Sequence, residues 1–367
     1  MKKFDRRNFI KSASIATAAA ATAGIAACSK KKNNESPSVV TGKTYEWKMV
    51  TAWPPQFPIL GEYAQKIANW IEAMSQGRMK IQVYGGGELV PALEVFDAVS
   101  QGVAEMAHSA SYYWAGKIPA SQFFASVPFG MNARQMNAWL YFGGGLEIWR
   151  ELYANFNIYP FASGNTGGQM GGWFNKEIIS LDDIKGLKIR MPGLGGKVIT
   201  KAGATSILSP GGELYTNLER GVIDALEWIG PYHDYLMGFN KISKYYYYPG
   251  WHEPGSTLEL MVNKNAYEEL PNDLKEIIKV AADASNVMIL AAFDQKNTEY
   301  YHKILNEGKV QFKEFPAEVL NSLKSYSEEV IEEIVSEDAM SKKAIDSYRK
   351  FKSSSYEWFK ITEKSYG

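Results

Sequence analysis

Alternation of apolar and polar residues divides the early part of the chain into short strands and amphipathic helices. Residues 46–51 (EWKMVT) and 78–84 (RMKIQVY) alternate as half-buried strands do. Between them, residues 59–75 place apolar side chains at helical spacing, which predicts an amphipathic helix. Residues 91–101 repeat the helical pattern, and residues 105–110 predict a third strand. This order indicates an α/β fold with a parallel or mixed sheet covered by helices on both faces.

The later part of the chain shows longer helical periodicities and one aromatic segment. Apolar residues recur at helical spacing from 271 to 301, which predicts one long helix. Residues 245–254 (YYYYPGWHEP) are expected to form an aromatic loop. The other predicted elements are helices at 132–155, 211–220, 234–244, 316–336 and 338–363, and strands at 157–163, 187–190, 222–227, 257–263 and 310–315.

Arg190 ends a short predicted strand beside a glycine-rich turn. Residues 187–190 alternate apolar and basic, and residues 192–196 then form a turn into a helix that starts near Lys197. Ligands bind at the carboxyl ends of strands in open α/β sheets, and a guanidinium there can hold a carboxylate with two parallel hydrogen bonds. A solvent-facing strand arginine is the alternative, and these residues alone favour it.

Three further polar residues are candidates for binding a carboxylate or a metal ion. Gln169 lies between two glycine pairs in a strand-like segment at 164–176, and glycine in a strand lets a ligand approach the backbone closely. Glu227 ends a predicted strand at the same sheet edge as Arg190, and Glu253 follows in the aromatic loop. Together they would form the oxygen-rich cluster that a hard cation prefers. The alternatives are a glutamine satisfied by the backbone and two solvated glutamates.

Two tyrosines follow the predicted strand at 105–110. By position, Tyr112 or Tyr113 can reach a ligand at the strand end. Packing under the following loop is an equally good interpretation of each, so the residues alone leave both open.

Two segments resemble the hallmarks of the solute-binding proteins of TRAP (tripartite ATP-independent periplasmic) transporters. These are SLDDIKGLKIRMPG, starting at Ser180, and ELYTNLERGVIDALE, starting at Glu213. The similarity extends from about Tyr45 to the C-terminus. The stretches GQMGGWFNK, EWIGPY and YYYYPGWHEPG are most similar to the branch that binds 2-oxo acids such as pyruvate together with a metal ion. The resemblance implies a two-lobed periplasmic binding protein with a mixed sheet in each lobe, long helices spanning the lobes and C-terminal helices.

The resemblance also implies roles for individual residues. It assigns the substrate to Tyr113, Gln169, Arg190, Trp228 and Trp251, and the metal to Gln169, Glu227, Trp228 and Glu253, with no catalytic residue. The ion is expected to be Na⁺ in preference to Ca²⁺. The ligand would be a small 2-oxo or 2-hydroxy monocarboxylate, captured by lobe closure and delivered to the TRAP membrane permease. A homodimer through the C-terminal helices is one option, and packing of those helices on their own body is the other.

The resemblance divides the body into lobes joined by crossing segments. Lobe I is expected at 45–165 and 254–290, and lobe II at 166–253. A C-terminal helical region is expected at 291–367. Hinges are expected near residues 163–167 and 254–257, which carry glycine or small residues.

The first 44 residues predict export and attachment to a membrane. Arg6 and Arg7 match a twin-arginine export signal, and residues 25–28 (IAAC) resemble a lipoprotein lipobox. We therefore expect residues 1–27 to be removed, Cys28 to carry lipid, and residues 28–44 to form a flexible tether. The protein would then lie at the periplasmic or cell-surface face of the cytoplasmic or outer membrane.

Composition and motifs limit the other classes of function. Without residues 1–44, the 40 basic and 40 acidic residues of the chain become 31 and 38, and a mildly acidic body gives no support to nucleic-acid binding. No nucleophile elbow, zinc-protease motif or phosphate-binding loop is present, so an enzyme that acts on 2-oxo acids is the weaker alternative. A receptor for dicarboxylates or sugar acids that needs no metal is the other.

Overall fold

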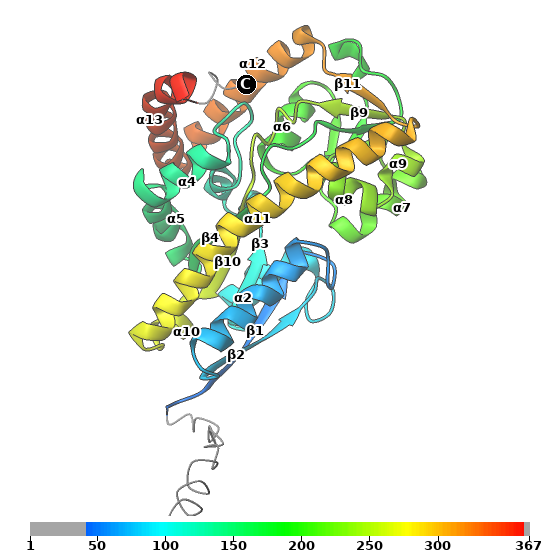
Figure 1. Cartoon of the computed structure of the whole chain (residues 1–367). Helices are drawn as coiled ribbons and strands as arrows, with labels where there is room; N and C mark the ends of the chain where they lie inside the picture. Colours follow the sequence, from blue (N-terminus) through cyan, green and yellow to red (C-terminus); the bar gives the residue numbers. More distant parts are fainter. Residues whose placement is uncertain (1–41, 363–367) are drawn as a thin grey trace, which may run out of the picture. The chain divides into compact units, whose positions relative to one another are not determined.

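The computed structural model describes residues 42–362 (Figure 1). The predicted signal at 1–27 and the lipidation site Cys28 lie outside the described residues, and so does most of the tether. Among residues 42–362, no helix has both the length and the apolar character that crossing a bilayer requires.

The first sheet is mixed and follows the predicted alternation of strands and helices. Its strands lie in the order β2, β1, β3, β10, β4. β2, β1 and β3 run parallel, whereas β10 lies antiparallel between β3 and β4. The strands are β1 (Tyr45–Thr51), β2 (Met79–Tyr84), β3 (Met106–Ser109), β4 (Ile158–Asn165) and β10 (Thr257–Asn263). We call this sheet with the helices packed on it the first lobe.

The second sheet, also mixed, is the core of the second lobe. Its strands lie in the order β11, β9, β5, β8, β6, β7. β6, next to the edge strand β7, is parallel to both of its neighbours, β8 and β7, so the carboxyl ends of these three strands share one edge of the sheet. The strands are β5 (Gly172–Phe174), β6 (Lys188–Arg190), β7 (Thr205–Ile207), β8 (Ala225–Leu226), β9 (Tyr245–Tyr248) and β11 (Gln311–Glu314).

Most helices correspond to predicted ones. The helix expected to start near Lys197 starts at Gly193 instead, and the segments predicted at 132–155 and 234–244 each form two helices. The long helix predicted at 271–301 is α11 (Asn272–Glu307), which packs on β4 and α2 at one end and on α8 at the other (Figure 1). α11 thus contacts both lobes. The other α-helices are α2 (Leu60–Met74), α3 (Val95–Ser100), α4 (Ala133–Phe142), α5 (Gly145–Ala154), α6 (Gly193–Lys201), α7 (Leu214–Glu219), α8 (Pro231–Leu236), α9 (Phe239–Ile242), α10 (Lys264–Glu268), α12 (Ala317–Glu337) and α13 (Ala339–Thr362).

Two segments, residues 166–171 and 249–256, carry the chain between the sheets and are hydrogen-bonded to each other. The amide of Thr166 donates to the carbonyl of Ser256 at 3.0 Å, and the amide of Gly250 donates to the carbonyl of Gln169 at 3.0 Å. The lobe and hinge boundaries predicted from the sequence stay predictions. β11 confirms the strand predicted at 310–315 and places it at one edge of the second sheet.

The aromatic loop predicted at 245–254 is wrong in its first four residues. Tyr245–Tyr248 form β9, which pairs with β5 on one side and β11 on the other. The ring of Tyr246 stacks on Trp173 with centroids 3.9 Å apart. Adjacent tyrosines in a strand point to opposite faces of the sheet, so each can pack against a different set of neighbours. The strand predicted at 222–227 is also shorter, because only Ala225 and Leu226 form β8.

A buried carboxyl group in β10 lies in the core of the first lobe. Glu259 accepts hydrogen bonds from Trp114 Nε1 at 2.7 Å and from the Tyr153 hydroxyl at 2.9 Å. Burial raises the pKa of Glu259 from 4.5 to about 8, and these two hydrogen bonds only partly offset it. Glu259 therefore holds its proton in the folded protein at neutral pH.

We predict that this proton makes the protein less stable as the pH rises from 5 to 8. Across that range the unfolded chain has lost the proton that folded Glu259 keeps, so the free energy of unfolding falls by up to about 1.4 kcal/mol per pH unit. Glu259→Gln should remove that part of the slope, measured by urea denaturation at four pH values. Glu72→Gln, on the exposed face of α2, is the matched control. Equal slopes for wild type and Glu259→Gln would contradict the prediction.

Candidate functional site

The site begins with Arg190 at the carboxyl end of β6. The side chain is 1% exposed, so the solvent-facing interpretation is wrong. Its Nη1 donates to the carbonyl of Glu227 at 2.7 Å and forms an ion pair with the Glu227 carboxylate. Pro192 and Gly193 end the strand directly afterwards and start α6, which fixes the guanidinium at the sheet edge. Arg190 is therefore held from one side by the strand next to its own.

The remaining edge of the guanidinium has no partner among the described residues. Nε and Nη2 of Arg190 are both buried and make no hydrogen bond. These two N–H groups lie on one edge of the planar group and point in nearly the same direction, which matches the two oxygens of a carboxylate. Buried donors without partners are costly. The geometry therefore leaves two donors available for an anion with two oxygens.

Two buried carboxylates lie beside Arg190. The ligand atoms of Glu227, His252 and Glu253 all lie within 4.8 Å of one another. His252 Nε2 is 2.8 Å from Glu227 Oε2. Burial, followed by the charge of Glu227, raises the pKa of Glu253 to about 7. The two acidic groups thus repel each other in a site that excludes water.

Gln169 connects this acidic pair to the first crossing segment. Its Nε2 donates to Glu253 Oε2 at 2.7 Å and to Thr166 Oγ1 at 2.9 Å, while its Oε1 is buried without a partner. Two carboxylates and a free amide oxygen form a hard donor set, which suits a cation such as Na⁺ or Ca²⁺. The residues present therefore fit a metal ion bound by oxygen.

Aromatic side chains from both lobes surround the site. The Arg190 guanidinium lies 5.0 Å from the ring centre of Trp228, which follows Glu227 in the chain. From the first lobe, the short 3-10 helix η2 (Ser111–Trp114) carries Tyr112 and Tyr113, whose rings meet edge to face at 4.8 Å. Burial raises the pKa of both hydroxyls, and the charges of Arg190, Glu227 and Glu253 act on both.

The structure brings together most of the residues predicted for the site. Arg190, Glu227, Glu253, Gln169 and Trp228 form one cluster, and Tyr113 faces its charges. The ring of Trp251 stacks on Phe129 at 5.8 Å and meets His252 at 5.5 Å, and its role in substrate binding stays a prediction.

Sequence reasoning missed or undervalued three residues of the cluster. The Thr166 hydroxyl binds Gln169, and His252 binds Glu227 directly. Tyr112 faces the same charges of the cluster as Tyr113 does. The position of Thr166 three residues before Gln169 was the one local signal available for it.

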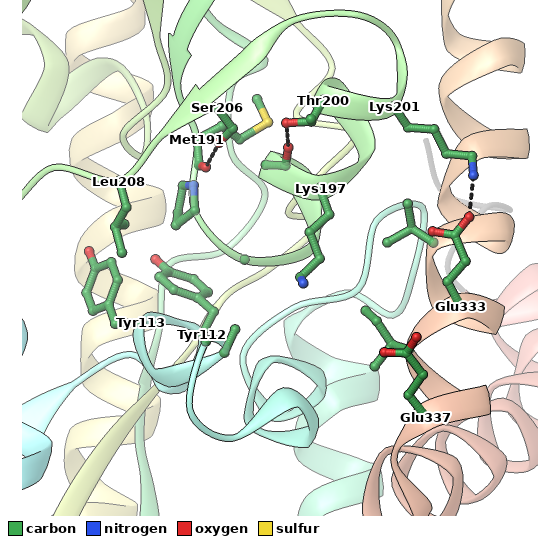
Figure 2. Close-up of a pocket in the computed structure, with 17 residues that line it drawn as sticks. Tyr112, Tyr113, Met191, Lys197, Thr200, Lys201, Ser206, Leu208, Glu333 and Glu337 are labelled. Carbon is green, nitrogen blue, oxygen red and sulfur yellow. Dashed lines mark hydrogen bonds and ion pairs between the residues drawn. The ribbon is translucent and has the colours of Figure 1, made fainter.

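A cavity of 720 Å³ opens beside the cluster between η2, α6 and α12 (Figure 2). Tyr112 and Tyr113 form one of its walls, but Arg190, Glu227 and Glu253 do not line it. Several of its polar groups are already paired. Ser206 donates to the Met191 carbonyl at 2.7 Å, Thr200 donates to the Gly196 carbonyl, and Lys201 pairs with Glu333 (Figure 2). The two tyrosines therefore line this cavity and are also subject to the buried charges.

The fold and the site together define a two-lobed extracytoplasmic solute-binding protein. Residues 49–338 match the model of the DctP family, described as bacterial extracellular solute-binding protein, family 7. The chain belongs to this family of TRAP solute receptors.

Three relatives extend over nearly the whole body. A monocarboxylate 2-oxoacid-binding periplasmic protein of Nostoc sp. is 43% identical over 364 residues, which cover 98% of this chain and 97% of the relative. A TRAP solute-binding protein of Colwellia psychrerythraea with bound calcium and pyruvate is 42% identical, with a TM-score of 0.86 over 88% of this chain and 99% of that one. One of Pseudoalteromonas atlantica with bound sodium and pyruvate is 41% identical, with a TM-score of 0.86 over 88% and 98%.

We predict that Gly193 is required for the contact between the lobes at this site. Its φ is +58°, and a Cβ there would lie 2.9 Å from the Cβ of Tyr112. Gly193→Ala should lower the free energy of unfolding by about 1–2 kcal/mol from the backbone alone, with a further loss from the contact. Gly212→Ala, where no atom lies within 4 Å of the new Cβ, is the control.

A double-mutant cycle with Tyr112→Gly, which removes the Cβ of Tyr112, separates the two contributions. The cost of Gly193→Ala should shrink in the Tyr112→Gly background, because the Cβ–Cβ contact is then absent and only the backbone contribution remains. If chemical denaturation gives the same loss in free energy of unfolding in both backgrounds, the Cβ of residue 193 and the side chain of Tyr112 do not clash, which contradicts the prediction.

Proposed function

We propose that this protein captures a small 2-oxo monocarboxylate such as pyruvate together with a metal ion and delivers it to a TRAP membrane permease. The observation that carries the proposal is the unpartnered Nε and Nη2 edge of the buried Arg190. A substrate carboxylate on that edge would complete the hydrogen bonding of the guanidinium. Relatives with 41–43% identity that are named for 2-oxo acids or contain pyruvate support the choice of substrate.

The metal ion follows from the charges in the site. Arg190 supplies one positive charge, whereas Glu227, Glu253 and an incoming carboxylate would supply three negative charges. Such charges are poorly screened in a cleft where Glu227 and Glu253 are 1% and 4% exposed. Glu227, Glu253, the Gln169 amide oxygen and the Trp228 carbonyl would hold the ion, which supplies positive charge next to the substrate oxygens. The preference for Na⁺ over Ca²⁺ stays a prediction.

The other residues of the site orient the substrate and exclude water. Gln169 would bridge metal and substrate. Trp228 covers one face of the guanidinium, and Tyr112 and Tyr113 close the cleft from the first lobe. Closure of the lobes about the two crossing segments would bury the substrate, as domain closure about a hinge commonly does.

Calorimetric titration of pyruvate tests this proposal. We predict that metal-stripped protein binds pyruvate more weakly than protein with Na⁺ or Ca²⁺ at the same ionic strength, by about 5–150-fold. Glu253→Gln should reduce this gain. Arg190→Lys keeps the charge but loses the two-pronged geometry, and should weaken pyruvate binding by about 10–100-fold because a charged hydrogen bond is worth about 1.5–3 kcal/mol. Arg349→Lys, a surface arginine of α13, is the matched control.

Two results would contradict parts of the proposal. Equal affinity with and without either ion would show that no metal takes part, and would favour a metal-independent receptor for dicarboxylates or sugar acids. Turnover of bound pyruvate would favour an enzyme.

We also propose that the mature chain is lipid-anchored through Cys28 and forms a homodimer through α13. The twin arginine and the lipobox-like IAAC support the anchor, and Tyr356 and Trp358 on α13, 51% and 62% exposed, support an interface. Intact-mass spectrometry of membrane-fraction protein should give a chain that begins at a lipidated Cys28. Native mass spectrometry should give the mass of a homodimer. A chain that begins at Met1 with free Cys28 would contradict the anchor, and a monomer at micromolar concentration would contradict the dimer.

A further inference from the structure

A loop of the first lobe inserts an aromatic side chain into the second lobe beside the site. Residues 52–59 connect β1 to α2, and Phe57 lies near the middle of this loop. The ring of Phe57 meets Trp228 edge to face at 6.1 Å and His233 at 4.6 Å. Both partners belong to the segment that follows β8 in the second lobe. Phe57 thus packs between a residue of the site and the first turns of α8.

A hydrogen bond between the lobes reinforces this insertion. His233 Nε2 lies 2.8 Å from the carbonyl of Pro58. A carbonyl only accepts, so Nε2 carries the proton and donates it. The Nδ1 atom of His233 is buried without a partner, and burial lowers the pKa of His233 to about 3. The imidazole is therefore neutral, and its one donor is used between the lobes.

Two residues of this loop adopt backbone conformations that their residue types rarely adopt. Gln56 and Ile59 have φ values of +54° and +57°, although neither is glycine and Ile59 is β-branched. The amide of Ile59 donates to Glu62 Oε2 at 3.2 Å, and the Phe57 carbonyl accepts from the amide of Gly61 at 2.8 Å. Strained backbone of this kind persists where surrounding contacts determine it, and it often occurs at functional sites. Here it presents Phe57 and the Pro58 carbonyl to the second lobe.

We propose that Phe57, Pro58 and His233 form an interlobe clasp that holds the lobes closed over the ligand and positions Trp228 against Arg190. Phe57 packs on the indole whose ring lies 5.0 Å from the Arg190 guanidinium, so it acts on the anion site through Trp228. None of the three clasp residues is needed to touch the ligand. The clasp therefore stabilises the closed lobes after the ligand has entered. Its loss raises the dissociation rate constant and leaves the association rate constant nearly unchanged. The assignment of pyruvate as ligand rests on the proposed function above.

Four variants separate the clasp from general stability. Phe57→Ala removes the aromatic ring that packs on Trp228 and His233. His233→Leu removes the N–H group that donates to the Pro58 carbonyl and keeps a similar side-chain volume. His233→Gln can place an amide N–H near the position of Nε2 and should restore the wild-type behaviour. Tyr267→Ala removes a half-buried aromatic that stacks on Tyr159 within the first lobe, and it is the matched control.

Stopped-flow tryptophan fluorescence of the full chain with pyruvate and Ca²⁺ gives both rate constants. We expect Phe57→Ala and His233→Leu to raise the dissociation rate constant by about tenfold and to change the association rate constant by less than about twofold. Tyr267→Ala should lower stability without changing dissociation. Unchanged dissociation in folded Phe57→Ala and His233→Leu, in a wild type that binds pyruvate, would overturn the clasp and leave the proposed function intact.

Failure of the wild type to bind pyruvate with either ion would overturn the proposed function instead. The clasp is then tested without ligand, by small-angle scattering of wild type and of the Phe57→Ala, His233→Leu double variant. A larger radius of gyration for the double variant would support the clasp. Equal radii would overturn it.

Discussion

The structure depends on one buried charge pair, formed by Arg190 and Glu227 at the edge of the second sheet. Burying two charges is expensive, and the cost is offset only where geometry and further hydrogen bonds are good. Here β6 and β8 are adjacent parallel strands, so the end of one strand places the guanidinium and the end of the other places both the carboxylate and a carbonyl acceptor. Nη1 of the guanidinium is satisfied in this way. Nε and Nη2 make no hydrogen bond, and this unpartnered edge is the one proposed to bind the substrate carboxylate.

Gln169 and Glu253 are positioned by the crossing segments rather than by the sheets. Gln169 lies in the first segment and Glu253 in the second, and the two are joined by side-chain and backbone hydrogen bonds. This contact requires Gly250, because a Cβ there would lie 2.2 Å from the Gln169 carbonyl oxygen. The segments about which the lobes would move thus also carry the polar atoms proposed to bind the metal. Under the proposed function, binding and closure would be coupled through the same short stretches of backbone.

Aromatic residues supply the contacts between the lobes. Tyr112 touches the start of α6 on one side of the site, and Phe57 packs against Trp228 and His233 on another. Such rings bury a large area with few rotatable bonds. An interface between lobes that must open and close benefits from this, since less side-chain entropy is lost at each closure.

The sequence by itself determined the elements and the residue types of the site. The period of the apolar residues predicted α2, α11 and the strands of the first sheet, because burial of one face imposes that period wherever the element lies. The position of Arg190 beside a glycine-rich turn also predicted a strand end. Tertiary structure alone decided whether Arg190 faces solvent or the core, since that depends on Glu227, 37 residues later in the chain. It also decided that Tyr245–Tyr248 form a strand, because pairing with β5 and β11 comes from distant segments. The roles of His252, Thr166 and Phe57 were decided in the same way, because single polar or aromatic residues carry no periodic signal and acquire a role only through the neighbours that folding brings to them.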